Sequence, residues 1–192
     1  MDGLASNKKL IYPAFFLAGV LVCMISFFIT PLLIMIYRAD QVFIDTNISP
    51  IVEEFLKGVP ILLFALFVTD KRDTLIWLSL TVGLGFSVLE NFFMIYADTA
   101  PVTLLWAVTR GAGTAVINCT CTMLLGLGIS YVRKRKKLFG CGTSALHMTA
   151  STLHAIFNLI AFSEYRYFCI LWAVMLSVPL ILMIIRLHRK KK

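Results

Sequence analysis

Six long apolar runs constrain this sequence more than any other feature. A helix needs about 20 apolar residues to cross a hydrocarbon layer about 30 Å thick. Hydrophobic residues make up 59% of the 192 residues, more than the roughly half that is usual in a soluble domain. We therefore expect an all-α, polytopic transmembrane helix bundle of about six helices, which forms a single membrane domain over residues 1–192. The expected helices lie at about residues 11–37, 50–69, 74–96, 101–131, 143–162 and 167–187.

The basic residues lie mainly at the ends of these runs and predict the orientation of the bundle. Lysine and arginine resist translocation, so they mark the cytoplasmic connections of a membrane protein. They gather before the first run, between the second and third, at 133–137, and after the sixth, whereas the connection at 38–49 holds one. We therefore expect both termini in the cytoplasm. Because topology accounts for these basic residues, no nucleic-acid partner is predicted.

Polar and ionisable side chains fall inside several of the predicted helices. A charged group at the centre of a membrane helix costs about 3 kcal/mol on insertion scales, which makes such residues candidates for function. With both termini inside, these residues share the outer half of the bundle, so the sequence predicts a site that opens away from the cytoplasm. The candidates are Glu53, Glu54, Lys57, Glu90, Asn91, Arg110, Asn118, His154 and Asn158.

The local spacing of these residues suggests how they are used. His154 and Asn158 are four residues apart and share one helix face. Glu53 and Lys57 have the same spacing, which permits an ion pair within the helix. Glu54 points about 100° away from Glu53, so we expect it to be free to act elsewhere.

Two kinds of chemistry fit this set of residues. Adjacent glutamates with a histidine and an amide are suited to activating water and holding an oxyanion. Glu54, Glu90 and His154 are equally the oxygen and nitrogen ligands of a divalent metal such as zinc. The sequence leaves a metal-dependent and a metal-free glutamate mechanism equally open.

Small residues concentrate on the third to fifth predicted helices. Such residues let membrane helices approach closely, so we expect these three helices to form the tight centre of the bundle. The glycines among them are Gly83, Gly85, Gly111, Gly113, Gly126 and Gly128.

In chain order, these residues resemble the PrsW family of intramembrane proteases, which are relatives of the CAAX-processing and bacteriocin-processing proteases. The resemblance covers about residues 50–160, and four motifs in order on four helices are more specific than any one of them. The motifs are Glu53-Glu54-x-x-Lys57; Gly83-Leu-Gly85-Phe86-x-x-x-Glu90-Asn91 with Tyr96; Arg110 followed by Thr122 and Gly126; and His154-Ala155-x-x-Asn158. One position departs from the family pattern, which has a histidine where this chain has Asn118.

The resemblance implies a peptidase of the bacterial plasma membrane. Its substrate would be a single-pass membrane protein, similar to an anti-sigma factor, cut near its extracytoplasmic membrane boundary. Glu53 or Glu54 would be the base for water, and His154 its partner in activating water or binding a metal. Asn158 would donate to an oxyanion or orient a ligand. Glu90 and Arg110 would shape the site, with Asn91, Lys57 and Asn118 in support.

Two other classes of function compete with this interpretation. A non-catalytic scaffold or sensor with the protease architecture is suggested by Asn118. A small proton-coupled transporter would use the same residue types. A transporter needs a polar path to both faces, whereas the cytoplasmic halves of the second to fifth helices are almost wholly apolar.

Overall fold

The computed structural model describes residues 8–97, 104–132, 136–165 and 168–189. These residues contain no strand and six long helices, which confirms the predicted all-α bundle. Residues 98–103, 133–135 and 166–167, which include parts of three predicted connections and helix ends, lie outside the described residues. The long helices are α2 (Lys8–Tyr37), α4 (Ser49–Phe67), α5 (Arg72–Ala97), α6 (Leu104–Val132), α7 (Phe139–Ala161) and α8 (Phe168–Arg189).

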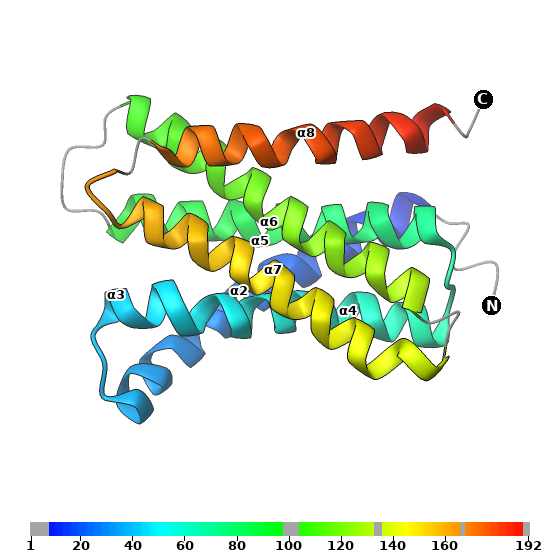
Figure 1. Ribbon diagram of the computed structural model, residues 1–192, viewed down its shortest axis with the longest axis horizontal. Helices are drawn as coiled ribbons and strands as arrows, with labels where there is room; N and C mark the ends of the chain where they lie inside the picture. The colour runs from blue at the N-terminus through cyan, green and yellow to red at the C-terminus, as the bar shows by residue number, and fades with distance from the viewer. Residues whose placement is uncertain (1–7, 98–103, 133–135, 166–167, 190–192) are drawn as a thin grey trace.

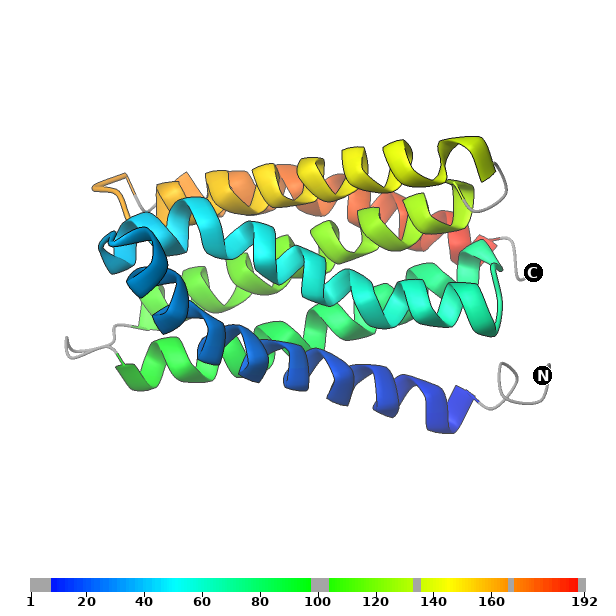
Figure 2. The same ribbon diagram turned by 90° about the horizontal axis from the view of Figure 1, so that it is seen from below.

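The helices run roughly along one common axis, and α6 occupies the middle of the bundle. α2 begins and α8 ends at the same end of the molecule, opposite the end at which the short helix α3 (Gln41–Phe43) lies (Figure 1 and Figure 2). In the apolar stretch of α6, 72% of the residues are buried, against 11% in that of α8. α6 is therefore the helix around which the others pack.

Four of the described helices are long and apolar enough to cross a membrane, and this identifies an integral membrane protein. These stretches are Lys9–Tyr37, Arg72–Tyr96, Arg110–Ser130 and Phe168–Arg186. α4 and α7 are not among them. α4 carries two glutamates and a lysine, and α7 is rich in serine, threonine and histidine. Most of the candidate site residues lie on these two helices.

The connection predicted at 38–49 is largely helical. Arg38 has a left-handed backbone, with φ of 52°, and turns the chain after α2. Asp40 then caps α3, accepting a hydrogen bond from the Phe43 amide at 2.7 Å. A π-helical turn, η1 (Ile44–Ile48), continues directly into α4. This segment therefore has a fixed backbone next to the start of α4.

Close helix contacts are made where glycines occur, as expected, but they also involve α2. A Cβ atom on Gly83 would lie 2.9 Å from the backbone of Asn118 and Cys119 in α6. Gly85 is two residues further and faces the opposite way, against the Phe16 backbone of α2. A Cβ atom on Gly19 of α2 would overlap the Val82 carbonyl oxygen of α5. α2 thus belongs to the tightly packed part of the bundle, where the sequence predicts the third to fifth helices alone.

We expect Gly83→Ala to destabilise the protein by about 1–3 kcal/mol, because the added methyl group forces α5 away from the α6 backbone. Gly111→Ala is the matched control, since its added methyl group would meet no described atom within 4 Å beyond its own stretch of helix. That control should be neutral or slightly stabilising, as alanine favours helix over glycine. Thermal unfolding in detergent measures both, and equal melting temperatures for the two variants would contradict the close approach of α5 and α6.

Candidate active site

A buried ion pair on α4 forms the centre of the candidate site. Lys57 Nζ lies 2.8 Å from Glu54 Oε1, and both side chains are fully buried. Lys57 thus pairs with Glu54 and not with Glu53, as the spacing also permits, and the prediction that Glu54 is free is wrong. Positions i+3 and i+4 are both neighbours on a helix, so spacing alone does not choose between the two glutamates. In the folded protein Glu54 faces α7, where His154 Nδ1 also lies 2.9 Å from its Oε1.

Asn118 connects this ion pair to Glu90 on α5. Its carbonyl oxygen accepts a hydrogen bond from Lys57 Nζ. Its amide nitrogen donates to Glu90 Oε2 at 2.7 Å. The ammonium group of Lys57 also lies 3.7 Å from the centre of the Phe86 ring. Asparagine suits this place because one side chain supplies both an acceptor for the ammonium and a donor for the carboxylate.

Glu53 and His154 form the next pair of groups, and each has a buried polar atom without a hydrogen-bond partner. In a neutral imidazole, the hydrogen bond that Nδ1 donates to the Glu54 carboxylate leaves a lone pair on Nε2. His154 Nε2 lies 3.7 Å from Glu53 Oε2. Both atoms are buried and have no hydrogen-bond partner. The site therefore presents an imidazole nitrogen and a carboxylate oxygen side by side, with a second carboxylate behind the imidazole.

Asn158 holds the π-helical turn that precedes α4. The Ser49 amide donates to the Ile44 carbonyl, five residues back, in the π-helical pattern. The same pattern would pair the Asp45 carbonyl with Pro50, which has no N–H to donate. The Asn158 amide instead donates to the Asp45 carbonyl at 2.9 Å. Asn158 thus fixes the entry of α4 from one turn beyond His154.

The remaining predicted residues make contacts outside this cluster. The Asn91 amide donates to the Gly111 carbonyl of α6 at 3.3 Å. The Arg110 guanidinium lies 5.9 Å from the Phe162 ring at the end of α7. Burial raises the pKa of the nearby Asp45 carboxyl, while its hydrogen bond with Gln41 and the charge of Arg110 act in the opposite direction. We therefore place Arg110 near the π-helical turn, whereas the partners of Glu54 are Lys57 and His154.

The described residues do not form the three-ligand metal site that the sequence allowed. Glu54 is bound by Lys57 and His154, and Glu90 is bound by Asn118. Among the described residues, no three His, Cys, Asp or Glu side chains converge as metal ligands. Catalytic zinc usually takes three protein ligands. Glu53 Oε2, Glu54 Oε2 and His154 Nε2 have no hydrogen-bond partner, but these described groups do not converge as three metal ligands, so the donor set does not fit such a centre.

Ser151 is a further polar residue at this place, and the sequence did not single it out as a site residue. It lies on α7 one turn before His154, is 2% exposed, and its hydroxyl has no hydrogen-bond partner. In the sequence it reads as one more small residue of a membrane helix. Only the position of α4 and η1 opposite it gives its hydroxyl a possible role.

Comparisons with known proteins agree with the residue pattern. A family profile described as "PrsW family intramembrane metalloprotease" matches residues 8–185. The chain is also similar to "Protease PrsW" of Clostridioides difficile (strain 630), at 23% identity over 162 residues. That alignment covers 80% of this chain and 64% of the relative, so the chain spans less than two thirds of the relative's length. No solved structure matches the chain significantly.

We expect Lys57→Met to destabilise the protein by about 3–5 kcal/mol, because it leaves the Glu54 charge buried without its partner. Lys71→Met, at an exposed position before α5, is the matched control and should change stability by less than about 0.5 kcal/mol. Adding Glu54→Gln to Lys57→Met should recover part of the loss, since both charges are then gone. Equal stability of the Lys57 and Lys71 variants in a thermal unfolding assay would show that the ion pair is not buried.

Proposed function

Because the chain belongs to the PrsW family of intramembrane proteases, we propose that it is an intramembrane endopeptidase whose water-activating pair is Glu53 and His154. One observation carries the proposal. Glu53 Oε2 and His154 Nε2 are buried, 3.7 Å apart and without hydrogen-bond partners. In a membrane bundle such groups are costly to leave unsatisfied, so they mark a place where a polar substrate binds.

The geometry suits a water molecule held by both groups. Two acceptors 3.7 Å apart can each lie at about 2.8 Å from one water oxygen, the usual O–H···O distance. Water donates its protons to Glu53 Oε2 and His154 Nε2 and directs a lone pair at a peptide carbonyl carbon. Glu54 keeps His154 in the required tautomer through Nδ1, as the third group does in a nucleophile–base–acid set.

The proposed reaction is peptide hydrolysis without a covalent intermediate. The water oxygen bonds to the carbonyl carbon, and Glu53 takes the proton that water loses. The tetrahedral intermediate then breaks its C–N bond, and the protonated Glu53 returns the proton to the leaving amine. The products are a carboxylic acid and an amine, which exchange a proton to become a carboxylate and an ammonium group, and the enzyme regains its starting state.

The buried network supports this reaction by holding His154 in place. Lys57 balances the charge of Glu54 and is itself tied to Glu90 through Asn118. Asn118 is thus an integrated member of the site, which favours an active enzyme over a non-catalytic homologue. Glu90, Lys57 and Asn118 are positioning residues in this scheme, and Asn158 positions the start of α4.

The proposed substrate is a single-pass membrane protein similar to an anti-sigma factor. We propose that both termini lie in the cytoplasm, following the distribution of basic residues, and that the enzyme lies in the bacterial plasma membrane, as its resemblance to the PrsW family implies. Glu53 and Glu54 lie about one turn into α4, and His154 lies about two turns before the end of α7. In that orientation cleavage takes place near the extracytoplasmic boundary of the membrane.

Glu53→Gln should lower the cleavage rate by about 10²–10⁴-fold, because the amide cannot take a proton from water. His154→Gln should have a similar effect. The control is Glu164→Gln, which makes the same change at an exposed position after α7. Purified variants in proteoliposomes are tested against a panel of single-pass membrane proteins, and unaltered cleavage by the Glu53 and His154 variants would sink the proposal.

The family is described as metalloproteases, yet the described residues offer two converging donors and not three. In the proposed scheme the cleavage rate should stay within about twofold after treatment with EDTA or phenanthroline, because no step needs a metal Lewis acid. Loss of cleavage on chelation, restored by Zn²⁺, would instead assign Glu53 and His154 as metal ligands.

A further inference from the structure

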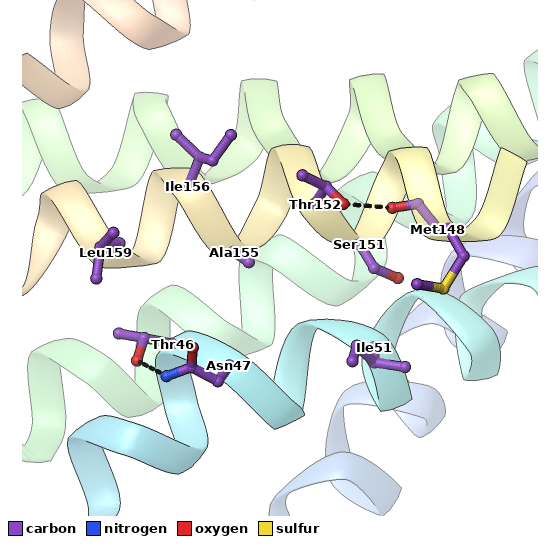
Figure 3. Close-up of a pocket in the computed structure, with 9 residues that line it drawn as sticks. All are labelled: Thr46, Asn47, Ile51, Met148, Ser151, Thr152, Ala155, Ile156 and Leu159. Atoms are coloured by element: carbon purple, nitrogen blue, oxygen red, sulfur yellow. Dashed lines mark hydrogen bonds between the residues drawn. The ribbon is translucent and has the colours of Figure 1, made fainter. Parts of the chain in front are cut away.

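Beside the proposed catalytic pair, a groove lies between α7 on one side and η1 with α4 on the other (Figure 3). We infer that this groove holds an extended, non-helical segment of the membrane-protein substrate, and that the Ser151 hydroxyl binds its backbone. This inference rests on the proposed function, since it names the part of the substrate that the site takes. It assigns to Ser151 and Ala155 a role in substrate binding.

The groove opens on the outside of the bundle. Its rim includes Met148 and Leu159, whose side chains are 56% and 60% exposed, and Ile51 of α4 on the opposite wall. At one end, His147 Nε2 contacts the Ile51 carbonyl at 2.9 Å, and its ring packs edge-on against Phe55. The groove is therefore closed at that end and accessible from the side, so a membrane protein can enter it laterally from the lipid.

The wall of the groove that α7 forms includes residues close to His154 in the chain. Figure 3 shows Ser151 and Ala155 on the side of α7 that faces η1 and α4. His154 lies between these two residues in the chain, and all three fall within about 100° of the helix surface. His154 and Glu53 do not line the groove themselves, so a chain bound there lies on the neighbouring side of α7 from the imidazole.

The size of the groove favours an extended occupant. It encloses about 230 Å³, which is below the roughly 300–1,000 Å³ of small-molecule sites. A helix with its side chains is about 10–12 Å across, so it can lie across the open side of the groove but not inside this volume. A few residues of extended chain do fit, and an extended chain also exposes the carbonyl that the activated water attacks.

The unpaired hydroxyl on the groove wall also favours an extended chain as the occupant. An unwound segment in a membrane has backbone groups without internal partners, and each unsatisfied group costs several kcal/mol. The Ser151 hydroxyl is buried, without a partner, and on the groove wall. It can donate to a substrate carbonyl. The carbonyls of an intact helix are already paired within it, so an unwound segment gains more from this hydroxyl than a helical one does.

Photo-crosslinking tests the inference independently of cleavage. The probe is a synthetic biotinylated single-pass peptide with a Gly-Ser-rich junction after its apolar stretch, and its partner peptide has an uninterrupted helix there. A photoreactive residue replaces Met148 on the groove, or Met175 on α8 as the control with similar exposure. Both are made in the Glu53→Gln protein so that the peptide stays intact. We expect about tenfold more crosslinking at Met148, and only with the Gly-Ser peptide, which corresponds to about 1.4 kcal/mol.

Two substitutions test the walls of the groove. Ala155→Leu fills it and should lower crosslinking at Met148 by about tenfold. Ala145→Leu, the same change at an exposed position further back on α7, should not. Ser151→Ala should lower it by about fivefold, the effect of one lost hydrogen bond of about 1 kcal/mol.

The outcomes separate this inference from the proposed function. Crosslinking at Met148 that Ala155→Leu blocks, without cleavage by the wild-type protein, supports the groove and contradicts the peptidase. Cleavage that persists in Ala155→Leu, with equal crosslinking at Met148 and Met175, supports the peptidase and overturns the groove. Equal crosslinking of the two peptides at Met148 also overturns it, since the groove would then not select an unwound chain.

Discussion

The ammonium group of Lys57 is the buried charge around which this site is arranged. It is fully buried in the bundle and needs partners that compensate for its lost hydration. Glu54 provides the opposite charge, Asn118 an acceptor, and Phe86 an aromatic face. Phe86 lies on α5 and Asn118 on α6, so the contacts of this one cation fix α4 against both helices. This arrangement determines where the proposed catalytic groups lie.

The same carboxylate serves structure and chemistry. Glu54 Oε1 contacts both Lys57 and His154 Nδ1, so the ion pair determines which nitrogen of His154 is free. The free Nε2 then faces Glu53, whose side chain is partly accessible at 14% exposure. In the proposed scheme Glu54 is bound to Lys57 and His154 through Oε1, and the adjacent Glu53 acts as the base. The two neighbouring glutamates thus differ in function because only one of them faces Lys57.

Much of the fold follows from the sequence, whereas the connectivity of the site does not. The apolar runs predict six helices, and intramembrane charges identify the residues of the cluster because such charges are costly. Helical spacing could not decide that Lys57 pairs with Glu54 and not Glu53, since both are within reach. Asn118 reads as a departure from a family pattern, and its bridging role depends on α5 and α6 being in contact. Ser151 reads as a small packing residue, because nothing in its own helix shows what lies opposite.

The proposed mechanism requires Glu53 and His154 to act on the same water molecule, and a double-mutant cycle on the cleavage rate tests this directly. Single-turnover rates are compared for the wild-type protein, Glu53→Gln, His154→Gln and the double variant. Groups that act as one unit show strongly non-additive effects, so the double variant should be about as slow as the slower single variant. If the two reductions multiply instead, the residues act independently and the proposed pair is wrong.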